Sequence, residues 1–250
     1  MPRVRRFSDY DPFAWLYHQY WGREFHAEIL PVLDKLLLKR LPPKSDILDL
    51  CCGDGRLTHQ LVRKGYRVTG LDGSEGMLAF ARQKTPRAEF LLADARSFRL
   101  PERFDAVIST FDSLNHVMKH EELRAVFGNV FAALRPEGTF VFDLNREEAY
   151  KELWARTFAT VDPKVVSIAR GAYHQYKRLA TCDITLFRMR GGWERSDFRL
   201  TQRCHSRSEV TKALRDAGFS FEVHDAAKTG MQGDIGSGRD IYVARKTESS

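Results

Sequence analysis

The stretch DILDLCCGDGRLTHQL, residues 46–61, carries the strongest fold signal in the chain. A short apolar run precedes the turn Gly53-Asp54-Gly55, and a helical pattern begins near Arg56. Glycine tolerates the backbone of a tight turn and lets a ligand approach the main chain closely. A strand, a glycine turn and a helix in this order predict the first βα unit of a parallel sheet that binds a nucleotide-like ligand.

Strand and helix signals alternate after this unit, as they do in a parallel sheet with crossover helices. Glycines and prolines close the expected helices, and two late strands complete the sheet. The sequence therefore predicts an α/β fold, a Rossmann-like sheet of seven mostly parallel strands with flanking helices and an antiparallel β insert. The expected strands are 46–50, 67–71, 88–92, 104–109, 139–144, 219–224 and 240–245, and the expected helices of the core are 57–64, 74–85 and 121–134.

Three carboxylates follow successive strands of this expected sheet. Asp49 lies near the end of the first strand, Asp72 ends the second, and Asp94 follows the third. In nucleoside-binding folds an acid after the second strand accepts from a ribose diol, and Asp94 is placed to accept from an adenine amine. A dinucleotide fingerprint would require a third glycine where this chain has Thr58, so we expect no pyrophosphate there. Asp49 instead suits a cofactor that carries positive charge. Each acid alone would also serve as a cap or turn residue, but the three together favour a nucleoside site.

The motifs DLCCGDG, GLDGSEGML, LLADAR, FDAVIST and ALRPEGTFVFDL resemble those of class I S-adenosylmethionine-dependent methyltransferases over residues 45–144. The resemblance implies S-adenosylmethionine as the cofactor and methyl transfer as the reaction. It also implies that Gly53 and Gly55 approach the methionyl part, that Asp72 binds the ribose, and that Asp94 with the Ala95 amide binds adenine. The cofactor-binding residues expected on this basis are Tyr17, Trp21, Asp49, Gly53, Gly55, Asp72, Gly73, Met77, Asp94, Ala95 and Thr110.

The two ends of the chain are similar to small-molecule N-methyltransferases, such as those of amino sugars and glycine. This resemblance implies that N-terminal aromatics, here Tyr17 and Trp21, close over the cofactor. Asp49 would lie near the methionyl amine of that cofactor, often through water. The amino-sugar enzymes carry a histidine where this chain has Ala133, so their base does not transfer to this sequence.

Four segments are expected along the chain. Residues 1–42 predict a helical cap over the cofactor site, and residues 43–150 predict the cofactor-binding core. Residues 151–205 carry β-prone runs and predict an antiparallel insert that walls the acceptor site. Residues 206–250 complete the core sheet and begin with a capping box, Ser206 to Glu209. Aromatic side chains of the insert are expected to enclose an apolar acceptor as a group. The alternative is that they only form the insert's own small core. These residues are Tyr173, Tyr176, Phe187, Trp193 and Phe198.

The loop STFDSLNHVMKH, residues 109–120, follows the fourth strand at the edge where such sheets bind ligands. Its polar candidates for contact with the acceptor are Asp112, Asn115, His116 and His120. His116, with Asp112 beside it, is the candidate catalytic base, because histidine titrates near neutral pH. The alternative is a histidine that is only hydrogen-bonded within the loop. The loop has neither an N-P-P-Y element nor a Pro-Cys nucleophile, and both absences favour a small-molecule acceptor methylated on nitrogen or oxygen.

Composition narrows the class of protein. The chain has 250 residues and a formal charge of +7, and its basic residues are spread along the sequence apart from Arg3, Arg5 and Arg6. We therefore do not favour a nucleic-acid partner, although an RNA or protein methyltransferase and a non-catalytic nucleotide-binding domain stay as alternatives. No apolar run reaches membrane-spanning length and no secretory signal is seen, so a cytoplasmic protein with no membrane partner is expected. The four cysteines lack metal-site spacing and predict reduced thiols and no metal.

Overall fold

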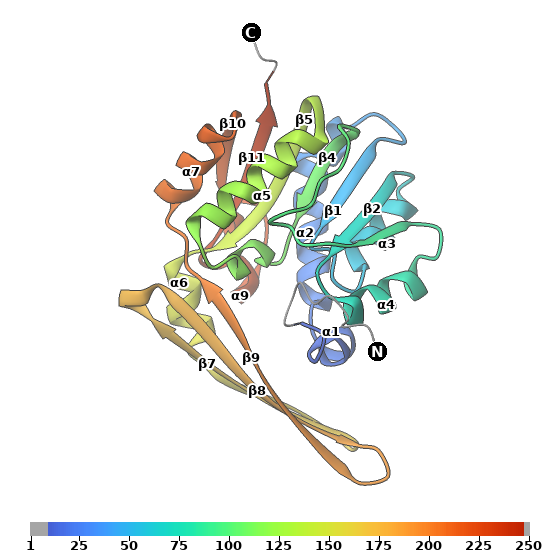
Figure 1. Cartoon of the computed structure of the whole chain (residues 1–250). Coiled ribbons are helices and arrows are strands. Elements are labelled where there is room, and N and C mark those ends of the chain that lie inside the picture. The colour runs from blue at the N-terminus through green and yellow to red at the C-terminus, as the bar shows by residue number, and fades with distance from the viewer. Residues whose placement is uncertain (1–9, 248–250) are drawn as a thin grey trace.

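A computed structural model describes residues 10–247, except for the side chain of Arg23. A seven-stranded sheet forms its centre, in the order β10-β11-β5-β4-β1-β2-β3 (Figure 1). Neighbouring strands from β3 to β5 are parallel, whereas β11 runs antiparallel to both β5 and β10. The seven-stranded, mostly parallel sheet is thereby confirmed. Its strands are β1 Asp46–Leu50, β2 Arg67–Asp72, β3 Glu89–Leu92, β4 Phe104–Ser109, β5 Leu134–Asn145, β10 Phe219–Asp225 and β11 Arg239–Lys246.

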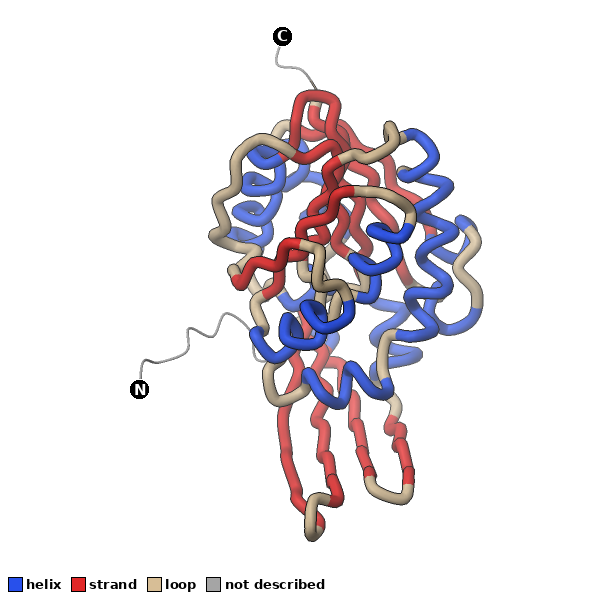
Figure 2. Tube along the Cα trace, turned by 90° about the vertical axis from the view of Figure 1, so that its right-hand side faces the viewer, coloured by secondary structure: helices blue, strands red, loops and turns tan. Residues whose placement is uncertain are grey.

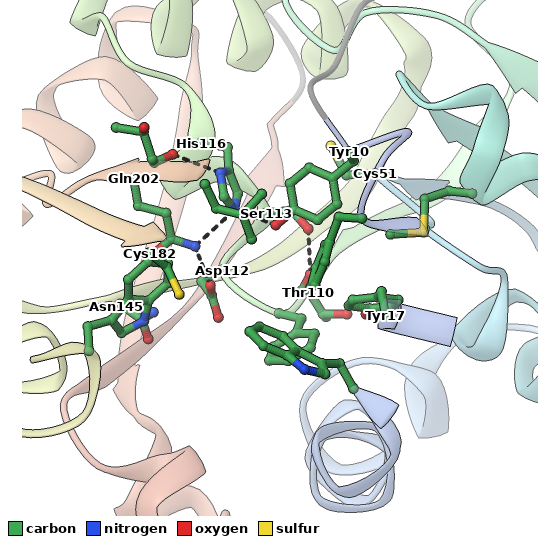
Figure 3. A pocket seen from close by; sticks show the side chains of 18 of the residues that line it. Tyr10, Tyr17, Cys51, Thr110, Asp112, Ser113, His116, Asn145, Cys182 and Gln202 are labelled. Carbon is green, nitrogen blue, oxygen red and sulfur yellow. Dashed lines mark hydrogen bonds between the residues drawn. The ribbon is translucent and has the colours of Figure 1, made fainter. Parts of the chain in front are cut away.

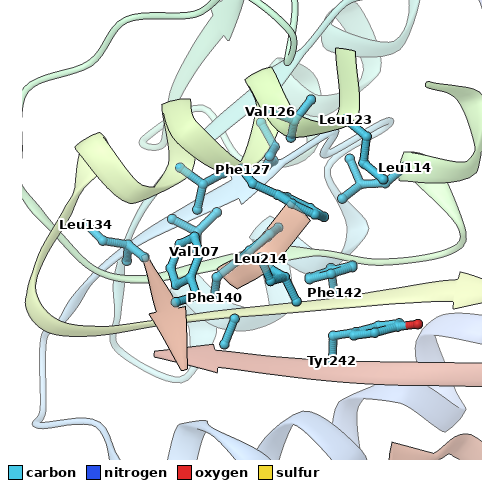
Figure 4. Close-up of a cluster of buried hydrophobic side chains, with 14 of the residues drawn as sticks. Val107, Leu114, Leu123, Val126, Phe127, Leu134, Phe140, Phe142, Leu214 and Tyr242 are labelled. Atoms are coloured by element: carbon cyan, nitrogen blue, oxygen red, sulfur yellow. The ribbon is translucent and has the colours of Figure 1, made fainter. Parts of the chain in front are cut away.

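Helices cover both faces of the sheet because the central strands are apolar on both sides. In β1, Ile47 packs with α2 and α3, while Leu48 faces the opposite side with α5 and α7. Figure 4 shows the second cluster, where Phe127 of α5 lies over Phe140 and Phe142 of β5. No helix within residues 10–247 is long and apolar enough to cross a membrane. The flanking helices are α2 Arg23–Leu36, α3 Arg56–Arg63, α4 Glu75–Lys84, α5 His120–Ala133 and α7 Arg207–Asp216, the last with the expected capping box.

A second sheet of four antiparallel strands projects away from the core (Figures 1 and 2). Helix α1, Ala14–Tyr20, packs against its root, since Leu16 shares one buried cluster with Ile184 and Leu200. The cap and the projecting sheet therefore share a core of their own, separate from the two cores of the central sheet. The strands are β6 Thr157–Asp162, β7 Val165–His174, β8 Leu179–Met189 and β9 Trp193–Arg203, and the short helical segments are η1 Leu38–Arg40, η2 Ser113–His116, α6 Glu147–Ala149, η3 Tyr150–Trp154, η4 Gln175–Lys177, α8 Ala226–Thr229 and α9 Gly233–Gly236.

Two strands differ from the sequence prediction. β5 starts at Leu134 rather than Thr139, because the strand contains a bulge: Phe104 pairs with Leu134, but Ala106 pairs with Thr139. Pro136 lies inside this bulge, where its missing amide costs no ladder hydrogen bond. β6 was not predicted, because it is an edge strand whose side chains are mostly exposed and carry no clear alternation.

Candidate active site

The carboxyl ends of β1, β2, β4 and β5 open into one cavity of about 1020 Å³. Helix α1 and the root of the projecting sheet form its other walls (Figure 3). Every cofactor-binding residue predicted from the sequence lines this cavity except Gly55. At Gly55 the backbone is left-handed, with φ +73°, and an added Cβ would meet Ala81 of α4 at 2.8 Å. The structure therefore gives Gly55 a packing role where α3 meets α4.

The residue that replaces a third glycine positions the first acid. Thr58 is fully buried, and its hydroxyl donates to Asp49 Oδ2 at 2.5 Å. Burial, with a smaller contribution from the neighbouring Asp72, raises the pKa of Asp49 to about 7, although the Thr58 hydrogen bonds oppose the shift. A nearby positive charge would draw this carboxyl back toward its ionised form. Thr58 and Asp49 therefore place beside the turn a carboxyl group that a cationic ligand would favour in its ionised form.

Asp72 organises the loop that joins β2 to α4. Its Oδ2 accepts from the Gly53 amide at 2.8 Å and its Oδ1 accepts from the Ser74 amide at 2.9 Å. Burial raises its pKa to about 6, although both of these amide hydrogen bonds lower it. Each carboxylate oxygen keeps a second lone pair, so the side chain is still able to accept hydrogen bonds from a diol. A Cβ added at Gly53 would have only Tyr17 within 4 Å, at 3.8 Å, so the main chain there lies open to a ligand.

The third acid is tied to a neighbouring cation. Arg96 donates to Asp94 through its side chain, at 2.7 Å from Nη2, and through its backbone amide at 2.8 Å. Burial raises the pKa of Asp94, but the hydrogen bonds from Arg96 outweigh burial and leave the pKa below its usual value. Asp94 is therefore an ionised acceptor at neutral pH. Met77 is buried on the cavity wall, as a side chain that covers a flat ring would be.

Helix α1 is anchored to the glycine turn. Phe13, Tyr17 and Trp21 face the cavity from this cap. The Arg56 guanidinium donates to the carbonyl oxygens of His18, in the last turn of α1, and of Trp21, its C-cap residue. His18 Nδ1 also contacts Asp54 Oδ2 at 2.7 Å, and this same carboxylate oxygen binds Lys84 at 3.0 Å. The turn that contacts the expected cofactor thus also holds the cap in place.

A buried ionic cluster forms the far wall of the cavity. Arg239 donates to Asp112 Oδ1 at 2.8 Å, and its other terminal nitrogen contacts Asp143 Oδ2. Its Nε donates to the Ile235 carbonyl, so each of the three guanidinium nitrogens has a protein partner. Asp112 is held in the left-handed region, with φ +48°, where its own amide donates to Asp143 at 2.9 Å. The cluster ties β4, β5 and β11 together and orients Asp112 toward the cavity.

His116 is fixed in one tautomer by its neighbours. Its Nδ1 lies 2.9 Å from the Thr201 carbonyl, an acceptor only, so Nδ1 carries the proton. Its Nε2 therefore accepts, from the Tyr10 hydroxyl at 2.7 Å and from the Gln202 side-chain amide at 3.0 Å. Gln202 donates to Asp112 Oδ2 at 2.6 Å as well, which fixes the orientation of its amide (Figure 3). Burial lowers the pKa of His116 and leaves a neutral ring at neutral pH.

Several predicted acceptor residues do not line the cavity. Asn115 is fully buried and structural, because it binds the Asn145 amide and the Arg203 carbonyl. His120 begins α5 outside the cavity. The five insert aromatics are also absent from the cavity wall: Phe198 packs on Phe13, and Tyr176 is fully exposed. The prediction that they enclose the acceptor is corrected. The projecting sheet instead contributes its root to the wall, through Phe158, Cys182, Arg199, Leu200, Thr201 and Gln202.

Among the lining residues that sequence reasoning missed, three form contacts around Asp112 and His116. Tyr10, Gln202 and Arg239 approach Asp112 or His116 from distant parts of the chain. No local motif marks Tyr10 or Gln202. Arg239 could have been found from its position. It begins the last strand, which runs antiparallel to β5, so it lies at the edge of the sheet where the other strands end in acids.

The comparisons with known proteins agree with this geometry. Residues 47–138 match a family model described as a methyltransferase domain. The "Putative methyltransferase YqeM" of Bacillus subtilis is 32% identical over 215 residues, covering 84% of this chain and 87% of that protein. The dTDP-3-amino-3,4,6-trideoxy-alpha-D-glucopyranose N,N-dimethyltransferase of Streptomyces venezuelae is 34% identical over 122 residues, 49% of this chain and 51% of that protein. The structure of SAM-bound CalS10, an amino pentose methyltransferase from Micromonospora echinaspora, superposes with a TM-score of 0.73 at 22% identity over 98% of this chain and 100% of that one.

Fold, site and relatives together define the class. The chain belongs to the class I S-adenosylmethionine-dependent methyltransferases. It is therefore an enzyme whose cofactor is S-adenosylmethionine, as the sequence motifs predicted.

Proposed function

We propose that this methyltransferase acts on a nitrogen of a small molecule. The observation that carries the proposal is the size of the cavity, about 1020 Å³, which leaves room for a small acceptor beside the cofactor between the cap and Asp112. Tyr10 and Trp21 close it from the cap, and Trp154 and Phe158 close it from the side of the projecting sheet. Relatives named as amino-sugar N,N-dimethyltransferases support nitrogen as the acceptor atom.

The residues present fit the cofactor. In this proposal Asp72 accepts from the ribose diol, Asp94 and Ala95 hold the adenine edge, and Met77 covers its face. Asp49, Gly53, Gly73 and Thr110 line the space for the methionyl part, and Tyr17 and Trp21 cover it. When bound, the cofactor would supply an electrophilic methyl group on a sulfonium, whose sulfur is the leaving group for attack by the amine lone pair. The cap of residues 1–42 and the insert of residues 151–205 then serve as lid and acceptor wall.

In this proposal His116 and Asp112 remove a proton from the acceptor amine. An amine enters mostly protonated and attacks only after it loses that proton. His116 Nε2 has an unshared pair and accepts hydrogen bonds in the cavity, so it takes the proton directly or through the Tyr10 hydroxyl. Asp112 stabilises the imidazolium that results through its own charge. Alignment of the amine by the enclosing aromatic rings supplies the rest of the rate enhancement.

A label-transfer experiment tests the proposal. The purified protein is incubated with methyl-labelled S-adenosylmethionine and separate fractions of small basic metabolites, RNA and protein. We expect label in the basic metabolite fraction, in a product whose methyl group is bonded to nitrogen. Label only in RNA or protein would contradict a small-molecule acceptor. The Michaelis constant of the true acceptor should also vary weakly with salt, whereas an acceptor bound through several phosphates would lose affinity steeply.

A further inference from the structure

Carboxyl groups outnumber cations on the cavity wall, although the whole chain is basic. Six carboxyl side chains and four guanidinium groups line the cavity, and none of its lining residues within the described part of the chain is lysine. The formal charge of the whole chain is +7, so the balance of charge on the cavity wall is opposite in sign to that of the chain. The carboxyl groups belong to Glu24, Asp49, Asp72, Asp94, Asp112 and Asp234, and the guanidinium groups to Arg96, Arg156, Arg199 and Arg239.

Each lining guanidinium group is already paired with a carboxylate. An anionic ligand would have to compete with these protein carboxylates for every cation. The pairs are Arg96 with Asp94 at 2.7 Å, Arg156 with Asp234 at 3.2 Å, Arg199 with Asp183 at 2.5 Å, and Arg239 with Asp112 at 2.8 Å.

The deepest of these clusters has a negative excess. Arg239 is one guanidinium shared by two carboxylates, Asp112 and Asp143, and all three side chains are buried. Asp143 does not line the cavity, so Asp112 is the member that presents the excess charge to a ligand. Asp143 Oδ1 has no hydrogen-bond partner in the described structure, and burial raises the pKa of Asp143 while Arg239 opposes the shift. A cation in the cavity beside Asp112 would balance this cluster.

The remaining wall of this half is aromatic. Tyr10, Trp21, Phe111, Trp154 and Phe158 all line the cavity. The faces of aromatic rings carry partial negative charge and attract ammonium groups, most strongly where water is excluded. Outside the cofactor half the lining carboxyls and guanidinium groups are equal in number, so the charge of this half is set by the cluster in which Asp112 and Asp143 share Arg239. That cluster and the aromatic faces favour the same sign of ligand charge.

We infer that the acceptor subsite selects an organic cation, a free amine that carries no phosphate or carboxylate group. This inference rests on the proposed function and narrows its substrate class. Two of the similar relatives are named for dTDP-linked amino sugars, which carry a diphosphate. In this chain every guanidinium group on the cavity wall is paired with a carboxylate, so none is available to bind a diphosphate. The nitrogen that this enzyme methylates therefore belongs to an unphosphorylated amine.

Two probes of equal shape and opposite charge test the inference. Benzylamine and benzoate are titrated separately into the protein saturated with S-adenosylhomocysteine, and Kd is measured by calorimetry. Trp21 and Trp154 on the wall provide a second readout by fluorescence. We expect benzylamine to bind at least about tenfold more tightly than benzoate, which is about 1.4 kcal/mol. Equal binding, tighter binding of benzoate, or no binding of benzylamine would each overturn the inference.

A charge variant sharpens the test. Asp234→Asn releases Arg156 at the cavity, so it should raise benzoate affinity and lower benzylamine affinity by a few-fold each. The matched control is Glu75→Gln, which breaks the exposed pair with Arg82 on α4 and should change neither Kd. Failure of the inference is distinguishable from failure of the proposed function, because label transfer to a small-molecule nitrogen does not depend on which probe binds.

Discussion

The two halves of the cavity are built from contacts of very different range. In the cofactor half, Thr58 binds Asp49 from nine residues away, and Arg96 binds Asp94 from two residues away. In the acceptor half, Tyr10 meets His116 across 106 residues and Arg239 meets Asp112 across 127. Local motifs therefore fix the cofactor half, whereas the acceptor half exists only in the complete fold.

This difference predicts separate failures. Changes in the acceptor half should damage turnover or folding and leave cofactor affinity near normal. Changes to the three acids of the cofactor half should weaken cofactor binding without disturbing the projecting sheet.

The largest expected effect is on folding, because the acceptor half is held by a buried ionic cluster. Arg239→Gln leaves the Asp112 and Asp143 carboxylates buried without their cation, and should lower the free energy of unfolding by about 3 to 5 kcal/mol. Urea denaturation measures the loss. The control is Arg195→Gln, which breaks a pair with Asp197 that is exposed on both sides and should cost at most about 1 kcal/mol. An equal loss of unfolding free energy in both variants would show that the buried cluster does not stabilise the fold.

The next effect is on turnover. His116→Asn removes the proposed proton acceptor and should reduce kcat at least about 100-fold with the acceptor identified by label transfer. Because burial lowers the pKa of His116, the wild-type rate should fall only at acidic pH, and this limb should vanish in the variant. His120→Asn, outside the cavity, is the control and should keep the wild-type profile. An unchanged acidic limb in His116→Asn would exclude the histidine as the base.

Cofactor affinity should depend on pH in the cofactor half. Burial raises the pKa of Asp49 to about 7 and that of Asp72 to about 6, and a cationic cofactor favours the ionised form of both groups. Affinity for S-adenosylmethionine should therefore rise with pH between 5 and 8, on the order of tenfold. Calorimetry at several pH values tests the rise, and Asp49→Asn should flatten its upper part. A flat profile in the wild type would contradict the assignment of these carboxyls.

The smallest effect concerns the hydroxyl that supports Asp49. Thr58→Val keeps the shape of the side chain, removes its hydrogen bond, and should weaken cofactor binding by about 1 kcal/mol. Thr85→Val is the matched control, since Thr85 is also buried and hydrogen-bonded, but its partner, His59, does not line the cavity as Asp49 does. Equal affinity in the two variants would show that Thr58 only fills space.

The range of contacts also explains what could be predicted from the sequence. The core strands were predicted close to their observed positions. All predicted cofactor-binding residues except Gly55 line the cavity, because strand, turn and acid are adjacent in sequence. The loop after β4 was located, yet its motif did not reveal that Asn115 is a structural bridge between β5 and β9. Tyr10 and Gln202 had no local signal, since their roles arise only when distant segments meet. The insert aromatics had a local signal, but most of the sheet projects beyond the cavity.

One calorimetric comparison tests the central claim that the two halves are separable and that the acids of β1 to β3 hold the cofactor. S-adenosylmethionine is titrated into the wild type, Asp72→Ala and His116→Asn, each first shown to be folded. We predict that Asp72→Ala loses about 1.5 to 3 kcal/mol of binding free energy, tenfold or more in Kd, because it removes the diol acceptor. His116→Asn should stay within about threefold of the wild type. Wild-type affinity in Asp72→Ala, or a comparable loss in His116→Asn, would contradict the account.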